Sequence, residues 1–387
     1  MINQEKKTRK VIKLPRAVYI VICSLPAALT ILYYALRHNY NAMNWVATRV
    51  SAPIRGALGV LSSIYPFSLF EILCVAAGIW LIYYIVRTIV VTARRREKLK
   101  LLGKRLLTIV TVTLYVWSLF CWLWNSVYHA PSFAAKNGFS GGGVAVDSLT
   151  YTTQMFATKA NELALIVSRD EEGKYVEDQR DLLSVSTMIY GNVFAEFPDL
   201  ECRLFRPKPM LFSWLMSRMG YTGVYCALTG ESNINTRAPI FLIPATIAHE
   251  LAHQCGVAAE DEANFVGILA CVTSNYSAYQ YAGYLMGLIY LRSALLSVDN
   301  EAWMRINNSL SAEVNRDMQD NNEYWHSQKT VETGVDFLDN VLTTVTGTVS
   351  NAVNTAYDGY LKSQSQELGI RSYGACVDLL VEYFATL

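Results

Sequence analysis

The chain has 387 residues, of which 52% are hydrophobic and 17% are charged, and its formal net charge at pH 7 is +1. This composition excludes intrinsic disorder, because a disordered chain needs low hydrophobicity and high net charge. It also disfavours an ordinary soluble enzyme, in which about a quarter of the residues are charged.

The near-zero net charge is the sum of two unlike halves. Residues 1–130 contain 17 lysines and arginines against 3 acidic residues, a balance of +14. Residues 131–387 contain the other 16 basic residues and 29 acidic residues, a balance of −13. The division predicts two parts with different surroundings. Because the acidic part would repel phosphate, we expect no nucleic-acid partner for it.

Three apolar segments in the first half are long enough to cross a bilayer. Residues 17–36 and 106–124 carry no charge, and residues 66–93 carry only Glu71 and Arg87, near the ends of that segment. About 20 helical residues cross the 30 Å hydrocarbon core. Residues 17–36 form too long an apolar run for a signal peptide and lack a cleavage site. We therefore predict a membrane anchor over residues 1–130, with helices at about 17–36, 67–91 and 106–127.

The lysines and arginines beside these segments predict the orientation of the anchor. Residues 1–16 contain six of them and residues 94–105 contain seven, whereas residues 38–65 contain only Arg49 and Arg55. Basic loops stay in the cytoplasm. We therefore expect a cytoplasmic N-terminus and an extracytoplasmic location for everything after about residue 130, with the lipid bilayer as a partner.

The rest of the chain reads as a Gly-rich linker over residues 131–149 and a mainly helical α+β domain over residues 150–387. Two short strands are predicted, at residues 221–228 and 239–243, separated by a turn. Residues 263–291 carry no charge, but polar residues interrupt them. We interpret this stretch as two buried helices with a break at Ser274-Asn275, not as a fourth span.

The motif His249-Glu250-Leu251-Ala252-His253 carries the predicted chemistry. Pro244 and Gly256 bracket it as a helix start and a helix end. Two histidines four positions apart project from one helix face, where they supply two nitrogen ligands to Zn²⁺. Glu250 emerges beside His249, where it can act as the general base on a water held at the metal.

A catalytic zinc needs a third protein ligand, and the acidic segment after Gly256 offers two candidates. Glu260 and Asn264 are four positions apart and share a helix face, so Glu260 could bind the metal while Asn264 orients a ligand imidazole. Glu262 points about 200° away from Glu260 and is the alternative ligand.

Two resemblances follow from these residues. The histidine pair followed by Glu260-Asp261-Glu262-Ala263-Asn264 resembles the gluzincin metallopeptidases, in which a glutamate is the third zinc ligand. In the CAAX prenyl endopeptidase and heat-shock membrane protease group, this second motif reads Glu-x-x-Ala-Asp. The resemblance implies a zincin-like domain, with Glu260 as ligand and the uncharged Asn264 in place of the aspartate.

Most of residues 20–387 also resemble an uncharacterised bacterial family of multispan membrane proteins that share a domain of unknown function. The matching stretches are residues 220–223, 229–235 and 249–265. This resemblance implies a multi-pass protein of the bacterial plasma membrane and a zinc site. It implies no substrate.

These features predict a membrane-anchored zinc endopeptidase that acts on peptides or proteins at the outer face, with a strand edge binding the substrate. A non-catalytic zinc-binding protein and a receptor-like membrane protein are the alternatives. Candidate oxyanion donors are Tyr276, Tyr279, Tyr281, Tyr284 and His326.

The five cysteines after residue 130 are an odd number and so are not a full disulfide framework. Cys202 and Cys226 could form a bridge outside the cytoplasm, or the cysteines could remain free thiols. The sequence does not indicate an oligomeric state.

Overall fold

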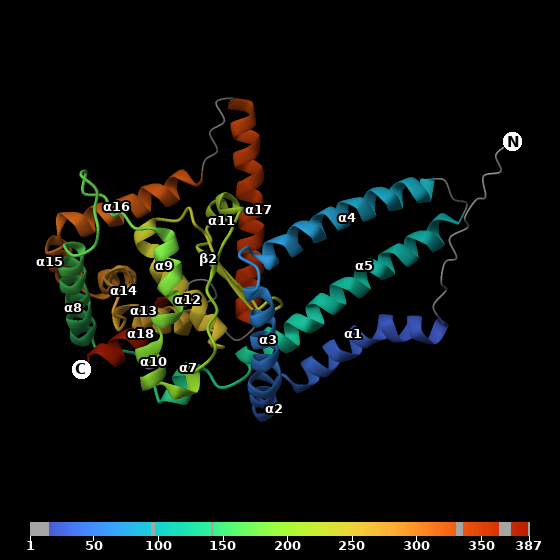
Figure 1. Ribbon diagram of the computed structural model, residues 1–387, viewed down its shortest axis with the longest axis horizontal. Coiled ribbons are helices and arrows are strands. Elements are labelled where there is room, and N and C mark those ends of the chain that lie inside the picture. The colour runs from blue at the N-terminus through green and yellow to red at the C-terminus, as the bar shows by residue number, and fades with distance from the viewer. Residues whose placement is uncertain (1–14, 94–96, 141–142, 330–335, 364–372, 386–387) are drawn as a thin grey trace.

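The computed structural model describes residues 15–93, 97–140, 143–329, 336–363 and 373–385. It is mainly helical, with one small sheet. Figure 1 shows three long helices, α1 (Arg16–Leu36), α4 (Leu69–Ala93) and α5 (Lys98–Phe120), extending away from a helical domain formed by the rest of the chain.

Four helices in the described residues are long and apolar enough to cross a membrane. Three are α1, α4 and the helix that begins with α5 and continues through η2 (Cys121–Asn125) and α6 (Ser126–Tyr128). The fourth is α14 (Ser277–Val298), in which 44% of the most apolar window is buried, against 11–17% in the other three. This difference places α14 in the core of the domain.

The three extended helices touch through side chains that donate hydrogen bonds to backbone carbonyls. On α5, the Tyr115 hydroxyl donates to Ile22 of α1 at 3.0 Å. The indole of Trp122 donates to Leu29 at 3.1 Å. Tyr84 of α4 donates to the Arg105 carbonyl at 3.2 Å. Between α1 and α4 the chain forms α2 (Tyr40–Val46), η1 (Ala47–Ser51) and α3 (Ala52–Ser63).

The domain core lies between long helices packed on one another. Helices α8 (Val146–Ala164), α12 (Ile243–Gln254), α13 (Glu260–Val272), α14 and α18 (Tyr373–Phe384) share it. Their apolar side chains, among them Phe156, Leu251 and Phe265, are fully buried. The break predicted at Ser274-Asn275 is confirmed, since α13 ends at Val272 and α14 begins at Ser277.

Shorter elements and one long helix surround this core. They are α7 (Phe133–Asn137), α9 (Gln179–Val185), η3 (Ser186–Met188), α10 (Gly191–Glu196), η4 (Pro198–Leu200), α11 (Ser213–Met219), α15 (Asn300–Asn308), α16 (Ala312–Ser327) and α17 (Asp336–Ser363).

The sheet has three strands in the order β1-β3-β2. β1 (Lys208–Pro209) runs parallel to β3 (Glu231–Ile234), and β2 (Gly223–Cys226) runs antiparallel to β3. The prediction of a strand at residues 239–243 is wrong. That stretch forms the helical turn η5 (Ile240–Leu242) and the start of α12, because Pro244 fits the first turn of a helix. The second strand is the polar β3, which sequence propensity had assigned to a turn.

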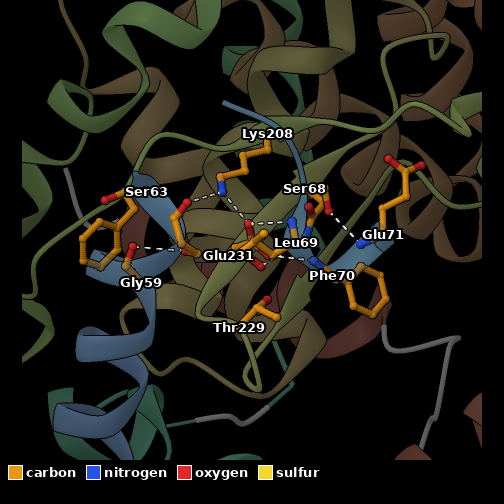
Figure 2. Close-up of polar contacts among 12 residues, drawn as sticks. Gly59, Ser63, Ser68, Leu69, Phe70, Glu71, Lys208, Thr229 and Glu231 are labelled. Carbon is orange, nitrogen blue, oxygen red and sulfur yellow. Dashed lines mark hydrogen bonds and ion pairs between the residues drawn. The ribbon is translucent and has the colours of Figure 1, made fainter. Parts of the chain in front are cut away.

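Glu231 of β3 joins the domain to α3 and α4. Its buried carboxylate accepts hydrogen bonds from the N–H groups of Leu69 and Phe70, the first residues of α4, at 3.0 and 2.9 Å. It also pairs with the ammonium of Lys208 at 2.5 Å. That ammonium donates to the Ser62 carbonyl at the end of α3 (Figure 2). Free N–H groups and the positive dipole end make a helix start a natural partner for a carboxylate.

Two more buried carboxylates bind distant N–H groups in the same way. Glu71 of α4 accepts hydrogen bonds from Leu211 and Phe212, directly before α11, at 2.9 and 2.6 Å. Glu262 of α13 does the same for Phe133 and Ala134 at the start of α7, both at 2.9 Å. The stretch predicted as a linker therefore begins with a helix whose Phe133 is buried in the domain core.

Replacing Glu231 with Gln keeps the shape of the side chain but leaves the Lys208 ammonium buried without its counter-charge. We expect a loss of about 3–5 kcal/mol in the free energy of unfolding, seen as a lower apparent Tm of the detergent-solubilised protein. The control is Glu162→Gln, which breaks the exposed pair with Lys159 and should cost at most about 1 kcal/mol. Equal Tm values in the two variants would contradict this role of Glu231.

Candidate metal centre

The motif histidines lie on α12, whose limits follow from its sequence. Pro244 occupies the first turn, as predicted, and the helix ends at Gln254. Gly256 adopts a left-handed φ of 91°. Its N–H donates to the His253 carbonyl, and the N–H of Val257 donates to Ala252. These two bonds are the Schellman pattern that ends a helix and reverses the chain.

The same turn orients the second histidine. The Val257 carbonyl lies 2.7 Å from Nδ1 of His253. Because a carbonyl can only accept a hydrogen bond, Nδ1 must carry the proton. Nε2 of His253 therefore faces the opposite side of the ring, toward the candidate site. A backbone carbonyl that holds one imidazole nitrogen in this way is the usual support of a histidine metal ligand.

Helix α13 returns alongside α12 at close range because of Gly267. A Cβ atom at this position would lie 2.8 Å from the backbone nitrogen of His249 and 3.0 Å from its Cα. The absence of a side chain lets the two helix backbones approach this closely. As a result Glu260, two turns earlier on α13, reaches the histidine face of α12.

Three donor atoms converge between the helices. Oε2 of Glu260 lies 3.2 Å from Nε2 of His249 and 3.8 Å from Nε2 of His253. All three donor atoms lie within 4.8 Å of one another. A tetrahedral zinc ion bound at about 2.0–2.1 Å holds its ligand atoms about 3.3 Å apart. The spacing and the nitrogen and oxygen donors therefore suit Zn²⁺.

The charges of the three residues are coupled. Burial alone would lower the pKa of His253, but the Glu260 carboxylate outweighs burial and raises it to about 9. Burial would likewise raise the pKa of Glu260, yet hydrogen bonds from His249 and His253 hold it well below its usual range. The metal-free cluster is thus an imidazolium–carboxylate pair, whose proton a metal ion must displace.

Glu250 lies beside the cluster with unused hydrogen-bonding capacity. Only 4% of the residue is exposed, and its Oε2 has no hydrogen-bond partner. Burial raises its pKa to about 7, which suits a group that takes and returns a proton near neutral pH. Its carboxylate packs against Gly223 at the start of β2, where a Cβ atom would lie 2.5 Å from Oε1.

Tyr357 of α17 completes the cluster, and the sequence did not indicate it. Its hydroxyl donates to Oε1 of Glu260 at 2.6 Å, which leaves Oε2 facing the histidines. The Tyr357 ring contacts the rings of Tyr221 and Tyr360. Tyr360 in turn donates to Asn125 in η2 at 2.6 Å. No motif marks Tyr357, which lies 97 positions after Glu260 in the chain; only the fold brings it to the site.

The other two acidic-segment candidates lie differently. Glu262 directs its carboxylate to the start of α7, as described above, and not to the histidines. Asn264 is half-buried on α13. No hydrogen bond joins its side chain to His249 or His253, although all three residues are in the described part of the chain.

Most of the tyrosines considered as oxyanion donors are engaged elsewhere. Tyr279 donates to the Leu182 carbonyl at 2.7 Å and Tyr281 to Asp317 at 2.5 Å, both deep in the domain core. Tyr276 reaches Met188, and Tyr284 packs on Phe156. His326 lies near the end of α16. Two other tyrosines contact the histidine–glutamate cluster: Tyr357 donates to Glu260, and the Tyr225 ring of β2 stacks on the His253 ring at 6.4 Å between centroids.

Residues of α3 and η2 touch the candidate site next to His253. The Trp124 ring in η2 lies edge-on to the His253 ring at 5.7 Å between centroids. The buried Arg55 of α3 lies over Trp124 and donates to the His253 carbonyl at 3.4 Å. The environment of this histidine is therefore built partly by residues from the N-terminal third of the chain.

Comparison with curated proteins finds no match, and comparison with solved structures finds none either. A family model described as "Protein of unknown function (DUF3810)" matches residues 47–381. This range includes α4, α5 and the whole histidine–glutamate cluster, so the chain belongs to the DUF3810 family of proteins of unknown function.

Proposed function

We propose that this chain is a membrane-anchored zinc-dependent endopeptidase. One observation carries the proposal: three donor atoms with the spacing of a tetrahedral zinc shell lie beside a buried carboxylate that has an unpartnered oxygen. A structural zinc site is closed by four protein ligands, whereas a catalytic site has three and leaves one position open. The cluster contains three such groups among the described residues.

In this proposal His249, His253 and Glu260 hold the zinc ion, and Tyr357 and the Val257 carbonyl hold the ligands in place. When bound, zinc supplies Lewis acidity, which makes water a nucleophile near neutral pH and polarises a peptide carbonyl. About a fifth of the His249 and Glu260 side chains is exposed, so solvent reaches the cluster.

Glu250 serves as the general base. Its carboxylate takes a proton from the attacking water and delivers it to the amine that leaves when the peptide bond breaks. A pKa of about 7 in its buried position suits both transfers. Gly223 allows the carboxylate to occupy this place, because any side chain there would displace it.

The substrate is a peptide or protein in extended form, bound along β2. This strand pairs with β3 on one side and is the last strand in the sheet order of the described residues. Its first residue, Gly223, contacts Glu250. A peptide that adds to this edge by main-chain hydrogen bonds would place a scissile bond beside the cluster.

The domain is proposed to face the outside of a bacterial plasma membrane, with α1, α4 and α5 as its three spans. In Figure 1 the start of α1, the end of α4 and the start of α5 point away from the domain. In the sequence these helix ends adjoin the basic stretches 1–16 and 94–105. The domain contacts the opposite ends, through Leu69 and Trp124. Basic ends in the cytoplasm therefore put the domain outside.

Replacing Glu250 with Gln should remove catalysis and leave the zinc ligands untouched. We expect peptide cleavage to fall by about 10²–10⁴-fold at an unchanged zinc content. The measurement uses purified protein in detergent, a fluorogenic peptide library and metal analysis. Glu172→Gln, a change to a well-exposed acid, is the control. Undiminished cleavage by the Glu250 variant, or no zinc-dependent cleavage by the wild type, would leave a non-catalytic zinc protein as the better function.

Zinc stoichiometry tests the third ligand. Glu260→Gln removes a charged donor at the cluster, and we expect it to weaken zinc binding by more than the 10–100-fold typical of supporting residues. Glu262→Gln should keep full zinc content and instead lower the apparent Tm, since its carboxylate holds the start of α7. The reverse pattern of zinc contents would transfer the ligand role to Glu262.

Zinc binding should release a proton at pH 7. His253 has a pKa of about 9 in the metal-free protein, so it is protonated at pH 7 and must lose that proton to bind zinc. Apparent zinc affinity should rise with pH and level off near pH 9. Calorimetry in two buffers of different ionisation enthalpy would measure the number of protons released on zinc binding. In Glu260→Gln the release should shrink, since the raised pKa depends on Glu260; zinc binding without proton release in the wild type would contradict the paired state.

A further inference from the structure

Two cysteines face each other at the C-terminal end of α12, the helix that carries His249 and His253. Cys255 follows α12, two residues after His253, and Cys202 lies just after η4. Their sulfur atoms are 2.8 Å apart. Non-bonded carbon atoms settle at about 3.5–4.0 Å, and sulfur is larger than carbon. A disulfide bond measures about 2.05 Å. The two sulfurs therefore lie closer together than non-bonded atoms normally do. A small movement would bring them to the length of a disulfide bond.

Neighbouring hydrogen bonds hold the two segments in register. The side-chain amide of Gln254 accepts a hydrogen bond from the N–H of Phe205 at 2.8 Å and donates to the Phe205 carbonyl at 3.0 Å. The same amide donates to Ser232 of β3 at 2.9 Å. These bonds fix the end of α12 against the segment that carries Cys202, so the approach of the sulfurs belongs to an ordered part of the domain.

The pair is accessible to a reagent. Both cysteines line a cavity of about 290 Å³ between the domain and the segment that contains α2, η1 and α3. Both residues are also partly exposed. The bridge suggested by the sequence, between Cys202 and Cys226, has no such support: Cys226 ends β2, and no sulfur contact joins it to Cys202, both being described residues.

We propose that Cys202 and Cys255 form an intramolecular disulfide in the membrane-inserted protein. The oxidant is a disulfide donor of the extracytoplasmic space, of the protein or glutathione class. One cysteine thiolate attacks the donor disulfide and releases one of its sulfurs as a thiol. The second cysteine thiolate then attacks the sulfur of the first cysteine in this mixed disulfide and releases the other donor sulfur as a thiol. Two cysteine thiols are oxidised, the donor is reduced to two thiols, and these take up the two protons.

The bridge would tie the end of the histidine helix covalently to the segment before β1. It would close a loop that contains the whole sheet, α11 and α12, and cross-links of long loops restrict the unfolded chain most. The inference rests on the proposed outer location of the domain, because the cytoplasm keeps thiols reduced. It does not rest on zinc or on catalysis.

The test traps the full-length protein in cells with N-ethylmaleimide, digests it without reduction and identifies linked peptides by mass spectrometry. We expect a Cys202–Cys255 linked pair in the wild type and in Cys226→Ser, and none in Cys255→Ser. Reduction should lower the Tm of the wild type and of Cys226→Ser but not that of Cys255→Ser.

A second arm treats reduced, purified protein with glutathione disulfide, which removes location as a variable. Failure to form the bridge there, or a Cys202–Cys226 linked peptide in either arm, overturns the proposal. Alkylation of both thiols in cells also overturns it. If the thiols are alkylated in cells but the purified protein forms the bridge, the proposed extracytoplasmic location of the domain is wrong. Zinc content and the Glu250→Gln comparison are unaffected by any of these results, so the proposed function stands or falls separately.

Discussion

Buried carboxylates that accept hydrogen bonds from the N–H groups of distant segments hold this chain together. Glu231 binds the start of α4, Glu71 binds the residues before α11, and Glu262 binds the start of α7. A carboxylate without partners is costly to bury, and a helix start has N–H groups to spare. Glu231 of the domain accepts hydrogen bonds from α4, and Glu71 of α4 accepts hydrogen bonds from the domain, so together they set how α4 meets the domain.

Glu260 follows the same rule with different partners. Its carboxylate is held by two imidazoles and a phenol in place of backbone N–H groups. The imidazoles can exchange a proton for a metal ion, which an amide cannot do at neutral pH. Glu260 and Glu262, two residues apart on one helix, thus differ in role: Glu260 belongs to the candidate metal centre, and Glu262 attaches the start of α7. The turn at Gly256 and the close approach at Gly267 bring Glu260 to its partners.

The sequence was sufficient where the determining contacts are local. Pro244, Gly256 and the histidine spacing predicted α12 and the shared face of His249 and His253, since helix ends and i,i+4 faces depend on neighbours in the chain. It failed at β3, whose polar residues form a strand because Lys208, α4 and β2 pair with it from distant positions. Tyr357 was missed for the same reason, since no neighbouring residue in the sequence indicates that it contacts Glu260. Whether Cys202 faced Cys226 or Cys255 likewise depended on tertiary contacts.

In the proposed membrane arrangement, the contact between Trp124 and His253 sets the distance between the candidate metal centre and the bilayer. Helix α5 has 23 residues and a length of about 34 Å, enough to cross the hydrocarbon core, and η2 follows it immediately. In that arrangement Trp124 lies at the headgroup level, and the histidine cluster is its neighbour. A reaction there would select substrates by depth as much as by sequence. A substrate chain that reaches the cluster would present the few residues that emerge directly from the membrane. A peptide bond farther from the membrane would not reach the cluster and would not be cleaved.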